Sequence, residues 1–261
     1  MKNDFEVILK QLDGSVKIAC ISDVHLGALE HMKREWEQFI KQVQTDPSLY
    51  LILNGDLINN NTRSSVGSPW DDTIRPREQK KRMVECLNPI KDKILCATSG
   101  NHERRSLKDA DDDPTYDIFA KLDLEDVYRQ NAAFMKIQLG DEKAFKTNNQ
   151  TSYTFAVTHG AGGGIYTGAT VNRNERWGNV IEGVDCVIVG HTHKGTVTRP
   201  SKLVFDPYNN KVTMRDYLVI SCVAWQKYAE YPLQKMMLPS STGNPQILYL
   251  NDKKKHIEVR W

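Results

Sequence analysis

Histidines and aspartates gather at one kind of position in this sequence. Five of the seven histidines directly follow short apolar segments that are typical of buried strands. Two aspartates do the same, in the sequences SDVH and NGD. The seven residues are Asp23, His25, Asp56, His102, His159, His191 and His193. A spaced cluster of imidazoles and carboxylates indicates metal or catalytic chemistry rather than a chance accumulation of polar residues.

The donor atoms of this set narrow the chemistry. Imidazole and carboxylate ligands without thiolate favour manganese, iron, zinc, cobalt or nickel over a structural zinc finger. Seven donors exceed the need of one catalytic ion, because such an ion keeps a coordination position open. Two ions about 3.5–4 Å apart would use the donors well, and such a pair serves displacement at phosphorus. The sequence therefore predicts two divalent metal ions as cofactors, with manganese favoured.

Parallel strands are needed to bring these side chains together. Apolar runs at residues 16–23 and 49–56 and before TSGNHE predict strands, and residues 29–43, 76–90 and 114–122 predict helices. This alternation favours right-handed crossovers and a parallel sheet. The carboxyl ends of the strands in such a sheet border the ligand crevice. We therefore expect the histidines and aspartates to lie along one sheet edge.

The second half of the chain reads as successive strands and hairpins. A single domain over residues 1–261, with two sheets each covered by helices, accounts for both halves. The first dozen residues fit either a strand or a helix. The long polar stretch 59–77 is expected to form a loop at the rim of the site, because loops of this length within a domain are usually functional or mobile. The glycine-rich stretch 159–164 is interpreted as a flexible turn rather than an anion site.

Five blocks in the order DVH, GD, GNHE, a lone H and GHTH span residues 23–193. This series resembles the calcineurin-like metallophosphoesterases, and the layout near the first blocks is similar to phage and prophage members. The resemblance implies a four-layer α/β/β/α sandwich of two mixed sheets, the metallophosphatase fold. It also implies a dinuclear centre, in which one metal is held by Asp23, His25, Asp56 and His193. The other metal is held by Asp56, Asn101, His159 and His191, so that Asp56 bridges the two.

The resemblance further implies roles for the residues after Asn101. His102 matches the catalytic histidine, which protonates the leaving oxygen and is not a ligand. We expect Glu103 to orient His102 as an outer partner. Arg104 and Arg105 are expected to bind substrate phosphate, with at most one in contact. Many relatives carry an acidic residue three positions after the second aspartate, where this chain has Asn59.

Composition sets wider limits. The chain is 39% hydrophobic and 26% charged, with a formal net charge of +2, which is not the composition of a protein that coats polyanions. Its five cysteines are widely spaced and form no CxxC pair. Neither a signal-peptide core nor a membrane-spanning stretch is expected. We therefore expect a cytoplasmic protein without a membrane partner, and the oligomeric state stays open.

The predicted function is a phosphodiesterase that hydrolyses nucleic-acid or nucleotide phosphodiesters through a metal-bound hydroxide, with DNA or nucleotides as partners. The form SDVHLG of the first block is similar to the nuclease branch of the family. Aromatic residues Trp225, Tyr228 and Tyr231 would then stack on bases or pack in the core. The alternatives are a phosphomonoesterase or protein phosphatase, and a non-catalytic binding scaffold of the same fold. The filled ligand positions disfavour the scaffold.

Overall fold

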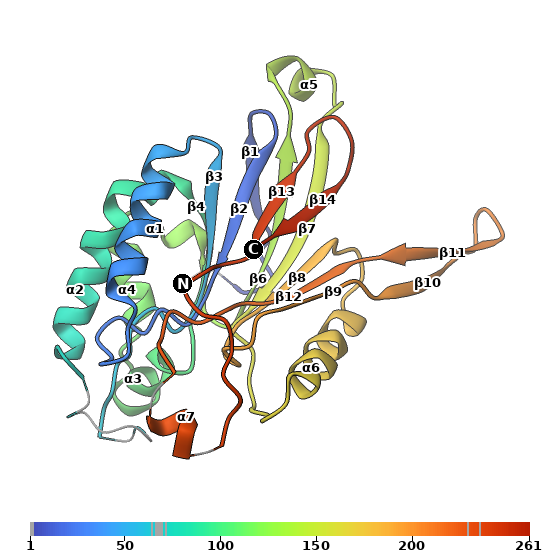
Figure 1. The fold of residues 1–261 in the computed structure, drawn as a ribbon. Helices are drawn as coiled ribbons and strands as arrows, with labels where there is room; N and C mark the ends of the chain where they lie inside the picture. Colours follow the sequence, from blue (N-terminus) through green and yellow to red (C-terminus); the bar gives the residue numbers. More distant parts are fainter. Residues whose placement is uncertain (1–2, 64, 66–69, 71, 229, 235) are drawn as a thin grey trace.

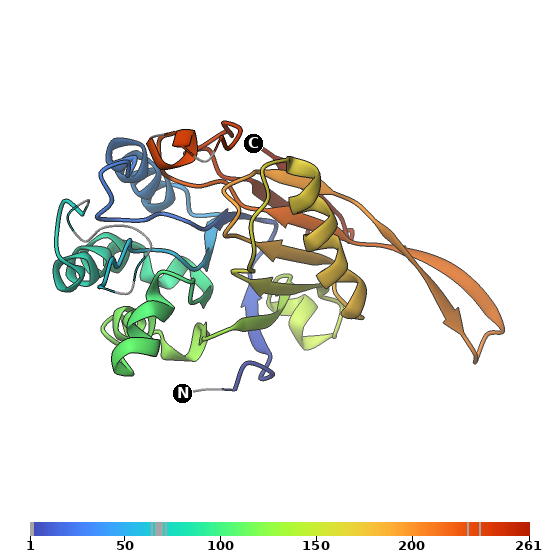
Figure 2. The same cartoon turned by 90° about the horizontal axis from the view of Figure 1, so that it is seen from below.

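Two mixed sheets form the centre of the molecule. The computed structural model describes residues 3–63, 65, 70, 72–228, 230–234 and 236–261. Within these residues two six-stranded sheets lie face to face, and helices cover both outer faces (Figures 1 and 2). This is the expected four-layer α/β/β/α arrangement of two mixed sheets, so the predicted fold class is confirmed.

The first sheet has the order β14-β13-β2-β3-β4-β5. Its strands are β2 (Val16–Ile21), β3 (Leu49–Asn54), β4 (Ile94–Thr98), β5 (Tyr128–Arg129), β13 (Ile247–Leu250) and β14 (Ile257–Arg260). Strands β2 to β5 pair in parallel, as the strand and helix alternation predicted. Their apolar runs are continuous because both faces of the strands are covered. The antiparallel pairs β2–β13 and β13–β14 make the sheet mixed.

Helices on the outer face connect these strands. They are α1 (Lys33–Thr45), α2 (Pro76–Leu87), the 3₁₀ helix η2 (Asn88–Lys93), α3 (Glu103–Ala110), α4 (Pro114–Ala120) and the 3₁₀ helix η3 (Glu125–Val127). Helix α1 buries Trp36, Phe39, Ile40 and Val43, as its periodicity predicted. It begins at Lys33 rather than at Leu29, because the preceding residues run alongside another segment and His31 pairs with Gln226.

The second sheet has the order β1-β6-β7-β8-β12-β9. Its strands are β1 (Ile8–Leu12), β6 (Ala132–Leu139), β7 (Thr151–Thr158), β8 (Cys186–Val189), β9 (Thr196–Thr198) and β12 (Leu218–Ser221). The start of the chain is therefore a strand, β1, which pairs in parallel with β6. A short helix, α5 (Glu142–Lys146), joins β6 to β7.

Helix α6 (Thr167–Val180) covers the outer face of this second sheet (Figure 2). The sequence did not indicate it, because its buried residues are Thr170, Asn174 and Gly178 rather than an apolar stripe. Two further elements are the hairpin β10 (Ser201–Asp206) and β11 (Lys211–Asp216), and the short helix α7 (Glu230–Gln234). None of the helices in the described residues is long and apolar enough to span a bilayer.

Trp225 lies in the core rather than on a binding surface. Its side chain is 1% exposed, and its ring centroid lies 5.1 Å from that of Trp36 and 5.2 Å from that of Phe39. The base-stacking interpretation of Trp225 is therefore wrong. Tyr228 is 43% exposed, and the side chain of Tyr231 lies outside the described part of the structure.

Trp225 predicts a stability difference. We expect Trp225→Ala to lower the free energy of unfolding by about 3–5 kcal/mol, because it leaves a cavity between two aromatic rings. Trp225→Phe should cost less, because it keeps a ring and removes an indole N–H that has no hydrogen bond among the described residues. Urea unfolding measures both changes. Trp261→Ala, at a residue that is 50% exposed, is the control and should cost about 1 kcal/mol or less.

Candidate metal centre

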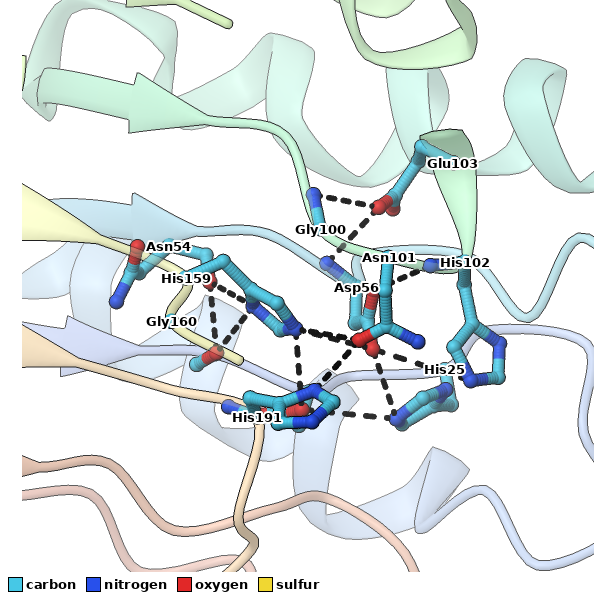
Figure 3. A network of polar contacts seen from close by, with 12 residues as sticks. His25, Asn54, Asp56, Gly100, Asn101, His102, Glu103, His159, Gly160 and His191 are labelled. Atoms are coloured by element: carbon cyan, nitrogen blue, oxygen red, sulfur yellow. Dashed lines mark hydrogen bonds and ion pairs between the residues drawn. The ribbon is translucent and has the colours of Figure 1, made fainter. Parts of the chain in front are cut away.

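The expected site residues converge where strands of both sheets end. Strand β2 leads to Asp23 and His25, β3 to Asp56, and β4 to Asn101 and His102. From the second sheet, β7 leads to His159, and β8 leads to His191 and His193. Figure 3 shows six of them, His25, Asp56, Asn101, His102, His159 and His191, around one central point. The side chains come together as predicted, but the prediction of a single sheet edge is wrong, because strands of two sheets supply them.

Asp23, His25 and His193 form the first group of donors. The Oδ1 atom of Asp23 lies 3.1 Å from Nε2 of His193 and 3.8 Å from Nε2 of His25. The two Nε2 atoms are 3.2 Å apart. Asp23 is fully buried, yet its Oδ1 has no hydrogen bond within the described part of the chain. A positive charge among these groups stabilises a buried carboxylate oxygen that faces two imidazole nitrogens.

Asp56, His159, His191 and Asn101 form the second group. Oδ2 of Asp56 lies 3.2 Å from Nε2 of His159. Oδ1 of Asn101 lies 3.0 Å from the same nitrogen and 2.6 Å from Nδ1 of His191. The two groups meet at Asp56, whose Oδ2 is also 3.8 Å from Nε2 of His25. Oxygen and imidazole donors in two overlapping groups fit two divalent ions.

His159 directs Nε2 toward the centre. Its Nδ1 is 2.8 Å from the backbone carbonyl of Asn54, and a carbonyl only accepts, so we infer that Nδ1 bears the hydrogen. Although burial alone would lower it, the carboxylates of Asp56 and Asp23 raise the pKa of His159 to about 10. The same positive charge holds the pKa of Asp56 below its usual value, against the effect of burial. The carboxylates therefore attract a cation, and a metal ion must displace the proton of His159.

Five of the expected ligands have a left-handed backbone conformation. The φ angles are 55° at Asp23, 47° at His25, 50° at Asp56, 69° at His191 and 55° at His193. This conformation is unfavourable for residues other than glycine by about 1–2 kcal/mol each. It turns the chain sharply where each strand ends, so that these side chains point into the centre. The N–H of His191 donates to Oδ2 of Asp23 at 2.9 Å and holds two of these turns together.

Glu103 holds the loops that follow β3 and β4. It is fully buried, and one carboxylate oxygen accepts from the N–H groups of Leu57 and Ile58 at 2.6 and 3.1 Å. The other accepts from Asp56 and Gly100, both at 3.0 Å (Figure 3). Burial and the charge of Asp56 raise the pKa of Glu103 to about 7. The four N–H donors nevertheless require the charged form, because each oxygen already accepts two of them.

The expected contact from Glu103 to the ring of His102 is therefore wrong. Nδ1 of His102 instead lies 2.6 Å from the backbone carbonyl of Asn59. The backbone N–H of His102 donates to Oδ1 of Asp56 at 2.8 Å. The backbone around Asn59 thus orients His102, and Glu103 acts on His102 only through the loops that it holds. The two residues are adjacent in the chain, but the start of α3 directs them differently.

An acidic residue of the rim stretch, Asp72, binds the side chain of Asn59. Asp72 accepts hydrogen bonds from the side chains of Asn59 at 2.7 Å, Asn61 at 2.8 Å and Gln79 at 2.7 Å. Neither Asp72 nor Gln79 could be singled out from the sequence, because their hydrogen bonds follow from how the loop folds rather than from a spacing in the chain. The run of three asparagines after the GD block was the available signal. Residues 64, 66–69 and 71 of the expected rim loop lie outside the described residues.

The two arginines after Glu103 point to different surroundings. Arg104 donates through Nη2 to the backbone carbonyls of Ser99 at 3.2 Å and Gln130 at 3.5 Å. Arg105 donates through Nη1 to Oδ1 of Asn61 at 3.1 Å, on the rim. Burial lowers the pKa of Arg105, although nearby carboxylates oppose this effect. Arg105 is therefore the one of the pair that lies at the rim.

Two basic side chains form hydrogen bonds to the glycine-rich stretch after His159. Arg173 of α6 donates to the carbonyls of Gly162 at 3.0 Å and Gly163 at 2.7 Å. Lys194, the residue after His193, donates to the carbonyls of Gly164 and Ile165. These contacts replace the expected free turn. They connect the loop after one expected ligand to the loop after another.

The sequence as a whole matches a known family. The family model described as calcineurin-like phosphoesterase matches residues 16–195. The chain belongs to the calcineurin-like phosphoesterase family. Members are metal-dependent hydrolases of phosphoric esters with a dinuclear centre, so this protein is a phosphoric ester hydrolase. The phosphoester substrate and the divalent cofactors that the motifs predicted are thereby confirmed at the level of the family.

Solved structures align along most of the chain at low identity. A conserved uncharacterised protein from Streptococcus pneumoniae, described as a predicted phosphoesterase, is 10% identical with a TM-score of 0.34, over 94% of this chain and 93% of that one. A hypothetical protein from Thermus thermophilus is 10% identical with a TM-score of 0.39, over 94% and 99%. A mutant cold-active protein tyrosine phosphatase is 13% identical with a TM-score of 0.34, over 95% and 79%. No curated protein matches the chain.

The shared position of Asp56 predicts the effect of its removal on metal content. We expect two ions per chain after loading with Mn²⁺ and dialysis, measured by mass spectrometry of the metals. Asp56→Asn should lower the affinity for both ions by at least about 100-fold, because it removes the donor common to both groups. His193→Ala should lose one ion and keep the other. The exposed Asp126→Asn is the control, and Asp56→Asn protein with unchanged metal content would disprove the bridging role.

Glu103 predicts a combined loss of stability and metal. Glu103→Gln replaces one acceptor oxygen by an NH₂ group, which leaves two buried N–H donors facing a donor. We expect the free energy of unfolding to fall by about 3–5 kcal/mol and Mn²⁺ affinity to fall with it. Urea unfolding and calorimetric titration measure the two effects. Glu125→Gln changes an exposed carboxylate and should alter neither; equal behaviour of the two variants would contradict the role of Glu103.

Proposed function

We propose that this protein is a dinuclear metal-dependent phosphodiesterase that acts on nucleic-acid or nucleotide phosphodiesters. The observation that carries the proposal is the meeting of two donor groups at Asp56, with His102 beside them. Nε2 of His102 is 3.9 Å from Oδ2 of Asp56. Site and acid are thus next to each other, where one phosphate group can reach both.

The proposed ligand sets follow the two groups. Asp23, His25, Asp56 and His193 hold one ion, and Asp56, Asn101, His159 and His191 hold the other. When bound, the ions supply Lewis-acid chemistry that neutralises charge on the phosphate oxygens. The buried Oδ1 of Asp23 and the inward Nε2 of His159 support this assignment, because each atom lies close to a donor of its own set: Oδ1 of Asp23 is 3.1 Å from Nε2 of His193, and Nε2 of His159 is 3.2 Å from Oδ2 of Asp56. The protein contributes the rigid placement of these donors.

His102 is the proposed general acid. Its Nδ1 bears a hydrogen toward the carbonyl of Asn59, so Nε2 is the ring atom that remains for the substrate. Burial lowers the pKa of His102 to about 3, and the ring is therefore neutral at neutral pH. An anionic phosphate against Nε2 stabilises the imidazolium and raises this pKa. Nε2 then holds the proton that the leaving oxygen takes.

The charge of the rim supports a diester over a monoester. A diester carries one negative charge, and a monoester carries up to two. Arg104 is directed to backbone carbonyls, which leaves Arg105 as the member of the pair at the rim. Tyr228 is 43% exposed. Its segment is hydrogen-bonded to the loop of the expected ligand Asp23, because the backbone N–H of Trp225 donates to the backbone carbonyl of Asp23. Exposed rings of this kind stack on bases.

The phosphomonoesterase is the second candidate, and Arg105 is the observation that favours it. A guanidinium at the rim can bind two oxygens of a terminal phosphate. Its present partners, Asn61 and Ser65, accept hydrogen bonds that a phosphate can replace. The two candidates therefore differ in how far Arg105 contributes to turnover.

A substrate panel distinguishes the candidates. With Mn²⁺, we expect kcat/KM for bis(nitrophenyl) phosphate to exceed that for nitrophenyl phosphate by at least about 10-fold. Cyclic nucleotides and short DNA strands should also be cleaved. Arg105→Gln should reduce diester turnover by less than about 10-fold. A preference for the monoester, together with a larger loss in Arg105→Gln, would establish the phosphomonoesterase instead.

The leaving group tests His102. We expect His102→Ala to retain its metal and to lose about 10²–10⁴ in kcat for a nucleoside or alkyl leaving group. The loss should be smaller for nitrophenolate, which needs little protonation. Equal losses would mean that His102 stabilises phosphate charge rather than delivering a proton. Because His102 also groups with His25 and Asp56 as possible metal donors, a missing ion in His102→Ala would make it a ligand.

A further inference from the structure

A two-stranded ribbon projects from the body of the molecule. Strands β10 and β11 pair only with each other among the described strands, and they extend away from both large sheets (Figures 1 and 2). A ribbon of two strands alone is marginally stable in water, because no third strand or second layer covers its faces. The residues on the faces of this ribbon therefore indicate what covers it.

One face of the ribbon is entirely apolar in its middle. Leu203 pairs with Met214, and Phe205 pairs with Val212, so these four side chains share one face. They are 76%, 74%, 68% and 57% exposed in that order. We call these four residues the apolar ribbon face. Tyr208, in the turn of the hairpin, is 95% exposed.

The opposite face of the ribbon attaches it to its own chain. Lys202 donates to the carbonyls of Gly178 and Ile181 at the end of α6, both at 2.5 Å. Arg215, the cross-strand partner of Lys202, lies 3.4 Å from Asp185. These contacts fix the direction of the ribbon at its root. The apolar ribbon face consequently points away from α6.

We propose that the apolar ribbon face binds the same face of a second copy of this chain, so that the protein forms a symmetric dimer. With Tyr208 in the turn, the exposed apolar side chains present on the order of 600 Å² per copy, which is the upper end of the usual range for the largest patch on a monomer. A stable interface contributes about 800 Å² per partner. Two stacked ribbons make a two-layer sheet, which supplies the second layer that each ribbon lacks.

The chemistry of the ribbon favours a second copy over other occupants. The four side chains of the apolar ribbon face carry no charge, so two copies meet without repulsion in an isologous contact. A nucleic acid would need cations on the apolar ribbon face, but Lys202, Lys211 and Arg215 all lie on the opposite face of the ribbon. Two of them, Lys202 and Arg215, are also bound to their own chain. A membrane would need an apolar tip. Here Asp206 accepts from the N–H groups of Tyr208 and Asn209, both at 3.1 Å, which makes the tip polar.

The dimer contact leaves the metal centre open. The ribbon leads into the amino end of β12, beside the amino end of β8, whereas His191 follows the carboxyl end of β8. Dimerisation is therefore independent of the proposed function, and variants of the ribbon should hydrolyse substrate like the wild type.

Sedimentation equilibrium from about 1 to 100 µM tests the proposal. We expect the wild type to show a concentration-dependent mass that approaches two chains. Phe205→Glu should raise the dissociation constant at least about 100-fold, because the contact then buries a charge from each copy. Met214→Glu, on the same face, should do the same. Thr213→Glu places the charge on the opposite face and should change the constant by less than about 3-fold.

Folding is checked by thermal unfolding of each variant at a concentration where the wild type is mostly a single chain, since exposed substitutions on the ribbon should leave the melting temperature of the single chain unchanged. A wild-type mass of one chain at the highest concentration would overturn the proposal. Equal weakening by Phe205→Glu and Thr213→Glu would also overturn it, because the contact would then not use the apolar ribbon face. Wild-type protein that remains a single chain but floats with phosphatidylserine vesicles would assign the face to a membrane.

Discussion

The buried carboxylate of Glu103 joins the two loops on which the centre depends. Its four hydrogen bonds to backbone N–H groups fix the turn that carries Asp56 against the turn that carries Asn101 and His102. Hydrogen bonds to a charged group contribute about 1.5–3 kcal/mol each, so this one side chain outweighs any other polar contact in the two loops. The centre needs such a bond because Gly100 has no side chain to position it; a Cβ there would lie 2.0 Å from Oδ1 of Asp56.

These bonds also offset the strain that the centre stores. Five expected ligands adopt positive φ angles, and three carboxylates lie buried within the same region. Both features oppose folding unless they are compensated locally. The hydrogen bonds of Glu103 compensate the strain in the loops after β3 and β4. The hydrogen bond from the backbone N–H of His191 to Asp23 compensates the strain in the loops after β2 and β8. Asn54 connects the sheets, because its Nδ2 donates to the carbonyl of Thr158 at 2.8 Å. The strain is thus distributed over both sheets, and divalent cations would reduce the remaining repulsion between Asp23 and Asp56.

The sequence predicted the features that depend on the periodicity of apolar residues. It did not predict the contacts between residues that are distant in the chain. The strand ends were predictable because each apolar run is followed directly by its polar residue, and strands β2 to β5 must align their ends in parallel. Three of the four partners of Glu103 were not, because they lie some forty-five residues earlier in the chain and are backbone groups without a sequence signal. The hydrogen bonds of Asp72 to Asn59, Asn61 and Gln79 likewise have no sequence signal. The choice between stacking and core packing stayed open for Trp225, because an aromatic residue in a loop has the same pattern whether it packs inward or outward. Helix α6 was missed because its buried face is polar.

The residues at the two ends of strands β8 and β12 are under different structural constraints. At their carboxyl ends, backbone strain and buried charge fix each residue near His191 and His193, so little can change there without loss of the centre. At their amino ends no ligand is attached, and an inserted hairpin has only to keep the contacts of Lys202 and Arg215 at its root. The length of the strands separates the two ends, and the rigid sheet between them prevents a change at one end from moving the donors at the other. Assembly through the ribbon and chemistry at the centre can therefore vary independently within one fold.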